Sequence, residues 1–103
     1  MKLIVLPWKK RDLDVDGDIL IWRPIMNVAK YVDSYHAAYI DLYNNGYVRL
    51  TVFYLENIKS TGFTSKVYNL PFETPEEEAK KFADEKLIEL GFQLLDEKLN
   101  AFL

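Results

Sequence analysis

Two stretches of the chain alternate between aliphatic residues and polar or aromatic ones, and a turn sequence separates them. The stretches are 35–43 and 47–54. Because successive side chains of a strand point to opposite sides, each stretch has one aliphatic face. The residues of these faces are Ala38, Ile40 and Leu42 in the first stretch and Val48, Leu50 and Val52 in the second. Asn44-Asn45-Gly46 can supply the positive φ of a short hairpin loop, so the pattern predicts an antiparallel hairpin.

A helix signal begins at Thr74. Thr74 suits an N-cap, Pro75 the first helical position, and Glu77 the third, which together would form a capping box. Apolar residues then recur with helical spacing at Ala79, Phe82, Ala83, Leu87 and Leu90. Gly91 is typical of the residue that follows a helix. We expect this helix to lie across the aliphatic face of the hairpin.

Shorter β-prone runs extend the predicted sheet. They are Lys2–Leu6, Ile19–Trp22 and Phe63–Leu70. The charged segment 9–18 contains Asp16-Gly17 and predicts a connection between the first two of these strands. Segment 25–32 has apolar residues at helical spacing, which favours a short helical turn over a loop.

The C-terminal residues leave two options open. Phe92–Leu95 could form a closing edge strand, or Leu95, Leu99 and Phe102 could form the apolar stripe of a second short helix, which we favour. The fold class is therefore α+β in a single domain over residues 1–103. It comprises an antiparallel sheet of about four to five strands, built from hairpins, with one C-terminal amphipathic helix packed on one face.

The composition of the chain argues against several classes of function. The chain has no cysteine and a single histidine, and its four glycines stand far apart, so thiol chemistry and glycine-rich phosphate loops are excluded. We expect no enzymatic activity and no cofactor. The net charge of −3 disfavours a nucleic-acid binder. The longest apolar runs are about four residues against the ~20 of a membrane span, and no signal-peptide pattern is present, so we expect a cytoplasmic protein.

Aromatic residues gather on the hairpin's other face. Fifteen per cent of the chain is aromatic, and six of its seven tyrosines lie between Tyr31 and Tyr54. The predicted partner-binding residues on this face are Tyr39, Asp41, Tyr43, Tyr47, Arg49 and Phe53. Tyrosine and arginine are enriched at interface hot spots, so we predict a protein-interaction module that binds another protein or a second copy of itself as a homo-oligomer. The alternative is that another segment of the chain covers this face and completes a second core.

A cluster of aspartates suggests a second possibility. The run from Asp12 to Ile19 resembles the first eight positions of an EF-hand calcium loop, with Asp12, Asp14 and Asp16 as alternating oxygen ligands and Gly17 at the turn. Position twelve, where a bidentate glutamate belongs, is Arg23. The pattern therefore predicts a solvated loop, with weak calcium binding as an alternative function.

A third possibility is a nucleic-acid-associated accessory protein. Trp8, Lys9, Lys10, Arg11 and Arg49 combine a ring with cations, which suits bases and phosphates. The aspartates that follow would largely cancel this positive field, and we expect Trp8 to be anchored in the core. The run 71–80 is similar to the strand-to-helix junction common in small bacterial and bacteriophage accessory proteins, and it implies no functional residue.

Overall fold

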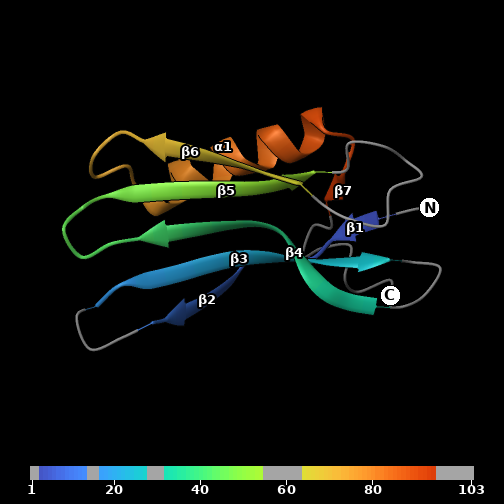
Figure 1. The fold of residues 1–103 in the computed structure, drawn as a ribbon, viewed down its shortest axis with the longest axis horizontal. Coiled ribbons are helices and arrows are strands. Elements are labelled where there is room, and N and C mark those ends of the chain that lie inside the picture. Colours follow the sequence, from blue (N-terminus) through green and yellow to red (C-terminus); the bar gives the residue numbers. More distant parts are fainter. Residues whose placement is uncertain (1–2, 14–16, 28–31, 55–63, 95–103) are drawn as a thin grey trace.

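The computed structural model describes residues 3–13, 17–27, 32–54 and 64–94. The elements are β1 (Leu3–Val5), β2 (Lys9–Asp12), β3 (Ile19–Asn27), β4 (Val32–Leu42), β5 (Val48–Tyr54), β6 (Thr64–Leu70), α1 (Glu76–Glu89) and β7 (Gln93–Leu94). The strands form one sheet in the order β6-β5-β4-β3-β1-β7, and β2 also pairs with β3 (Figure 1). The α+β class is confirmed.

The sheet is larger than predicted, and it is mixed. The described residues form seven strands instead of four or five, and β1 pairs with β7 in parallel. One cause is the length of β3, whose nine residues accommodate two short strands end to end along one edge. The charged segment predicted as a connection supplies one of these, β2. Backbone pairing does not need apolar side chains, and all four residues of β2 are exposed.

The predicted helical turn at 25–32 is wrong where the structure describes it. Residues 25–27 belong to β3 and Val32 begins β4, while 28–31 lie outside the described residues. The strand continues through Pro24, whose carbonyl accepts a hydrogen bond of 2.8 Å from the Leu6 amide. Pairing with β1 on one side and β4 on the other therefore overrides the helical spacing of the apolar residues.

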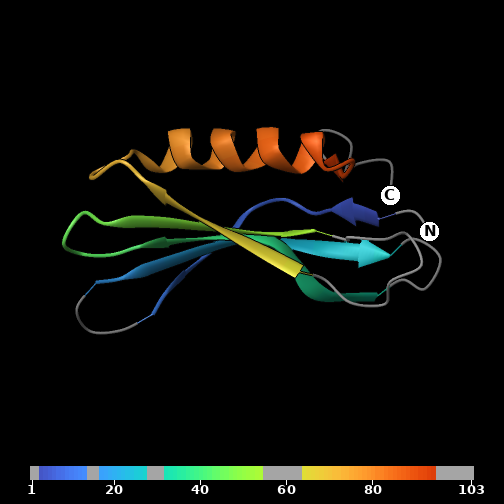
Figure 2. The ribbon, with the colours of Figure 1, turned by 45° about the horizontal axis from the view of Figure 1, so that its top comes forward.

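The central hairpin is confirmed, and α1 covers its aliphatic face (Figure 2). In register, Ile40 lies opposite Leu50 and Ala38 opposite Val52. The fully or nearly buried core is completed from β1, β3 and the helix. It comprises Val5, Ile21, Ile25, Ala37, Ala38, Ile40, Val48, Leu50, Val52, Ala79, Ala83, Leu87 and Phe92. The predicted strand at 63–70 is confirmed over Thr64–Leu70 as β6, and Phe63 lies outside the described residues.

The helix begins one residue later than its sequence signal. Pro75 occupies the N-cap position and makes no side-chain cap, and the Thr74 hydroxyl donates to the Pro71 carbonyl. The predicted capping box is therefore wrong. Glu76 in the first turn instead pairs with Lys10 of β2 and with Lys80, both at 3.3 Å. This acidic first turn still complements the positive end of the helix dipole.

The helix ends at the predicted glycine, but Leu90, which was expected in the apolar stripe, is the C-cap residue and is 47% exposed. Gly91 has φ +90°, and its amide donates to Ile88, while the Phe92 amide donates to Leu87, both at 3.0 Å. These two bonds form a Schellman motif, whose hydrophobic contact here joins two core residues, Leu87 and Phe92.

The chain after Gly91 returns to the sheet. β7 corresponds to the edge-strand option, and residues 95–103, where a second helix was favoured, lie outside the described residues. In the described part of the chain, no helix is long and apolar enough to cross a membrane.

Candidate interaction face

The side of the sheet opposite α1 gathers all six predicted partner-binding residues. Alternation along the strands places them there, because Ile21, Ile40 and Leu50 point toward the helix. We call this surface the open face and define it by Leu20, Trp22, His36, Tyr39, Asp41, Tyr43, Tyr47, Arg49, Thr51 and Phe53. In Figure 2 the helix lies on the other side of the sheet.

The aromatic rings of the open face contact one another in pairs. Tyr39 and Phe53 lie with ring centroids 5.6 Å apart, as do Tyr43 and Tyr47 across the hairpin. These tilted geometries are within the favourable range for aromatic pairs. Each ring is therefore held by a neighbour before any partner arrives, which lowers the entropy cost of binding.

Polar groups lie among these rings. Arg49 and Asp41 form a cross-strand ion pair of 3.5 Å, and the Arg49 guanidinium lies 5.8 Å from the centroid of the Tyr43 ring. Burial raises the pKa of Asp41 above its ordinary value, although Arg49 acts in the opposite direction. Tyr47, 38% exposed, donates its hydroxyl to Asn69 of β6. The centre of the face is thus partly dehydrated, while its margin stays open to solvent.

Two polar atoms of the open face are buried without a hydrogen-bond partner in the described structure. They are Nε of Arg49 and the hydroxyl of Thr51, a residue only 3% exposed. Thr51 lies opposite Tyr39 on one neighbouring strand and Val67 on the other. Buried polar groups are nearly always paired, so an unpaired hydroxyl here costs stability.

Sequence reasoning missed Trp22 and His36, whose rings lie 5.9 Å apart. Trp22 was detectable, because alternation within β3 separates it from the buried Ile21. His36 was not, because simple alternation puts it on the helix side with Ala38. A register shift lets Ala38 pair with Arg23 while His36 pairs with Pro24, and the extra residue, Ala37, is buried. Because the extra residue interrupts the alternation, His36 points to the open face and not to the helix side.

The alternative of a self-covered face finds no support in the described residues. Residues 25–27 lie within the sheet, and β7 lies at its edge beside β1. Helix α1 is the one described helix, and it packs on the other side. Residues 28–31 and 95–103, which that alternative also involved, lie outside the described part of the chain.

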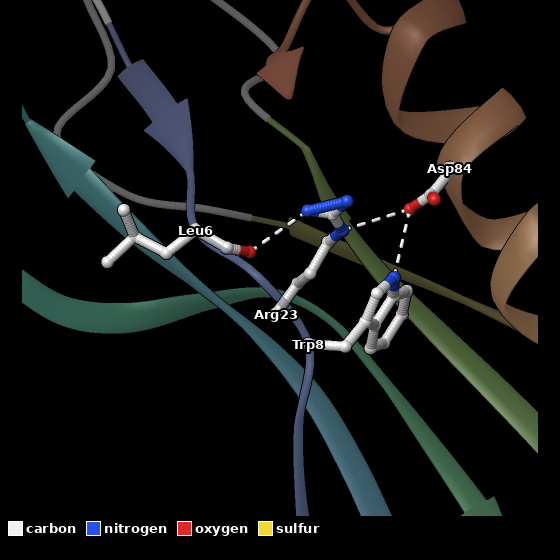
Figure 3. A network of polar contacts seen from close by, with 4 residues as sticks. All are labelled: Leu6, Trp8, Arg23 and Asp84. Atoms are coloured by element: carbon white, nitrogen blue, oxygen red, sulfur yellow. Dashed lines mark hydrogen bonds and ion pairs between the residues drawn. The ribbon is translucent and has the colours of Figure 1, made fainter. Parts of the chain in front are cut away.

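A groove of about 700 Å³ lies between α1 and the segment that connects β1 to β2, which contains Pro7 and Trp8. Its centre is a polar network (Figure 3). Asp84 of the helix accepts hydrogen bonds from Nε of Arg23 at 3.0 Å and from the Trp8 indole at 3.2 Å. Arg23 also donates to the Leu6 carbonyl at 3.0 Å, and its guanidinium lies 5.4 Å from the centroid of the Trp8 ring.

This network joins the sheet to the helix. Arg23 is only 7% exposed, and burial raises the pKa of Asp84, while Arg23 and Trp8 act to lower it. Alternation along β2 places the cations of the run Trp8-Lys9-Lys10-Arg11 on opposite sides of the sheet. Trp8 packs against the core as expected, and Lys10 contacts Glu76 on the helix side. Lys9 and Arg11 pair with residues whose side chains point to the open face.

The structure describes only one of the three candidate calcium ligands. Asp12 is exposed in β2, and Asp14 and Asp16 lie outside the described residues. Asp18 accepts a hydrogen bond of 2.8 Å from the Asn44 amide of the hairpin turn. Among the described residues, no three histidine or acidic side chains gather as metal ligands.

The open face combines preformed ring pairs, a partly buried ion pair, two half-buried tyrosines and one exposed tyrosine, Tyr47, which is the chemistry of a binding surface. The predicted residues come together on it, although their role in binding is a hypothesis. No family model, curated protein or solved structure matches this chain, so its function must be argued from its own residues.

Proposed function

We propose that this protein is a non-enzymatic interaction module that binds a protein partner through the open face. The observation that carries the proposal is the co-location of four paired aromatic rings and the Asp41–Arg49 pair on the side of the sheet opposite α1. Such a surface buries a large apolar area at a small loss of side-chain entropy.

The composition of the face favours a protein partner. Tyrosine and arginine are enriched at the cores of protein interfaces, whereas lysine and glutamate are depleted. The six predicted residues include three tyrosines, one phenylalanine and one arginine, no lysine or glutamate, and one residue of a type that is also depleted, Asp41. Arg49 and Asp41 would set the orientation of a partner through hydrogen bonds, and the rings would supply most of the buried area.

The test compares affinity capture by the wild type with capture by Tyr43→Ala and Tyr47→Ala. We expect both variants to lose the captured partner while their melting temperatures change by only a few degrees, because exposed cross-strand pairs contribute about 0.2–1 kcal/mol. Light scattering on the purified wild type and on both variants shows whether the partner is a second copy of the chain, because only self-association through the open face would be lost in the variants.

The matched control is Ile88→Ala, which removes a 60% exposed aliphatic side chain from the helix. Capture should survive this change. If Tyr43→Ala and Tyr47→Ala unfold the protein, the rings belong to the core and the proposal fails. It fails equally if both variants fold and capture the partner as well as the wild type.

A second candidate, binding of single-stranded nucleic acid on the same face, is favoured by one observation. The register of β2 against β3 pairs Lys9 with Trp22 and Arg11 with Leu20, which adds two cations beside the rings. Single-stranded nucleic acid binds to surfaces where aromatic rings stack on the bases and cations contact the phosphates. The net charge of −3 opposes it.

The two candidates are separated by titration with a single-stranded oligonucleotide. The variant Trp8→Phe leaves Trp22 as the sole tryptophan, so stacking would quench its fluorescence. Binding that weakens steeply with salt would support this candidate. An unchanged emission at low salt would dismiss it.

A further inference from the structure

β6 is the last strand at one edge of the described sheet. In the described part of the chain β6 pairs only with β5, through seven consecutive residues without a register shift. Among the described residues, the backbone donors and acceptors on its other side have no strand partner, and such an edge can template another strand. Lys66 is the one charged residue in this strand, and no proline interrupts it.

The opposite side of the sheet is protected by contrast. There β2 consists of four residues that are all charged and all exposed, and β7 is only two residues long. Short or charged edges resist pairing with another chain. The edge formed by β2 and β7 is therefore poorly suited to pairing with another chain, whereas the edge of β6 is suited to it.

We propose that β6 pairs antiparallel with β6 of a second copy of this chain, about a two-fold axis at Val67. This register alone pairs all seven residues of the strand. It places Val67 opposite its own copy, Lys66 opposite Tyr68, Ser65 opposite Asn69, and Thr64 opposite Leu70. A shift of the axis to Lys66 would place two like charges directly opposite each other, which is destabilising.

The side chains of β6 suit this register on both sides of the sheet. Val67 is 53% exposed and points away from the helix, so the two copies would cover each other's apolar surface. On the helix side, the Lys66 ammonium already lies 5.2 Å from the centroid of its own Tyr68 ring. In the pair it would lie beside the Tyr68 ring of the second copy as well, and cation–π contacts strengthen when they are partly desolvated.

A hollow beside the strand leaves room for this contact. It has a volume of about 260 Å³ and lies between β6 and the end of α1. Tyr68, Lys66, Lys86 and Leu90 are among its lining residues. The Lys86 ammonium lies 5.9 Å from the Tyr68 ring centroid on this side. A second tyrosine ring entering here would meet two cations and an exposed leucine.

This inference is independent of the proposed function, because Val67 is outside the residues that define the open face. The axis is perpendicular to the sheet, so pairing would leave both open faces on the same side and extend them into one surface. Loss of pairing and loss of the partner can therefore be measured separately, with substitutions at Val67 and at Tyr43 or Tyr47.

The experiment follows the mass in solution by light scattering over a concentration series. We expect the wild type to reach twice its mass of 12.1 kDa and Val67→Glu to raise the dimer dissociation constant by at least about tenfold, since like charges then meet on the axis. Mixing Val67→Glu with Val67→Lys should restore a dimer. Ile88→Glu, the same charge change on the helix, should leave dimerisation intact.

A cross-linking variant tests the register even where charged residues disturb folding. The chain contains no cysteine, so Val67→Cys introduces a single thiol. Oxidation should join two chains rapidly, because the axis brings both residues together, whereas Ser65→Cys should cross-link far more slowly. A wild type that stays monomeric at every concentration overturns the inference. A dimer that survives Val67→Glu, or equal cross-linking at both positions, overturns it too.

Discussion

Nε of Arg23 donates a hydrogen bond of 3.0 Å to Oδ1 of Asp84, although 61 positions separate the two residues in sequence. The bond connects the middle of β3 to the middle of α1. It explains how a nearly buried arginine is accommodated in a sheet that otherwise turns aliphatic side chains toward the helix. The Trp8 indole shares the same carboxylate oxygen, so one acceptor serves donors from two parts of the chain.

Asp84→Ala should destabilise the protein by about 2–3 kcal/mol, because both donors lose their acceptor and one of them is a buried charge. Asp84→Asn keeps an oxygen in place and should cost less than about 1 kcal/mol. Urea unfolding of the two variants measures the difference. Equal losses would show that the negative charge, and not the hydrogen-bond geometry, sustains the network.

The free energy of unfolding should depend on pH through the titration of Asp84. Burial raises its folded pKa above the ordinary value of 3.8, so between these two values the native state binds more protons than the unfolded chain. Raising the pH through this window therefore lowers the free energy of unfolding. The stability of the wild type minus that of Asp84→Asn should fall with rising pH across the window and level off above it, as measured by urea unfolding at a series of pH values.

Glu76 provides the control of opposite sign. Burial opposes the effect, but hydrogen bonds from Lys80 and Lys10 lower its pKa below the ordinary value of 4.5. Its stabilisation is present above pH 4.5 and is lost as the pH falls through the lowered pKa. The stability of the wild type minus that of Glu76→Gln should therefore rise with pH. The same sign for both residues would contradict this account.

Thr51→Val should leave stability unchanged or increase it by up to about 1 kcal/mol. The substitution keeps the shape of the side chain and removes a buried hydroxyl that has no partner in the described structure. Thermal unfolding provides the measurement, and Thr51→Ala, which removes volume as well, should destabilise. A clear loss of stability in Thr51→Val would mean that the hydroxyl is bonded in solution.

Gly46→Ala should cost about 1–2 kcal/mol, more than Gly17→Ala. Both glycines have φ +87°, so both substitutions introduce about 1 kcal/mol of backbone strain. A Cβ at Gly46 would also lie 2.8 Å from the Phe72 ring and 2.9 Å from Glu73, whereas nothing lies within 4 Å at Gly17. Chemical denaturation of the two variants isolates this contact, and equal losses would show that Phe72 moves aside freely.

The contact at Gly46 illustrates a limit of sequence reasoning. Asn44-Asn45-Gly46 correctly predicted a hairpin turn. The packing of that turn against the β6–α1 connection, where the Glu73 amide donates to the Gly46 carbonyl at 2.7 Å, involves residues 27 positions apart. The same limit applies to Asp18, which appeared only as one of several loop aspartates and in fact bonds to the Asn44 amide.

Most residues of the open face could be predicted from the sequence, because the side chains of a strand alternate between its two sides. This alternation placed Tyr39, Asp41, Tyr43, Tyr47 and Arg49 on one side, as the structure does. It failed for His36, because the bulge at Ala37 depends on how β4 pairs with β3. An alternation rule contains no information about a neighbouring strand.

Local interactions were sufficient to specify the hairpin, β6 and the helix with its Schellman end, because period-2 and period-3.6 patterns and glycine conformations act within a few residues. β2 was missed because its charged sequence has no apolar alternation, although it pairs with β3 over a short separation in sequence. Long-range pairing was required for β7, for the extension of β3 through Pro24 and for the partly buried Arg23–Asp84 pair. Each of these depends on backbone or side-chain partners from distant parts of the chain. Asp84 in the helix and β7 after it become neighbours of the sheet only when the hydrophobic effect has packed the helix onto the sheet.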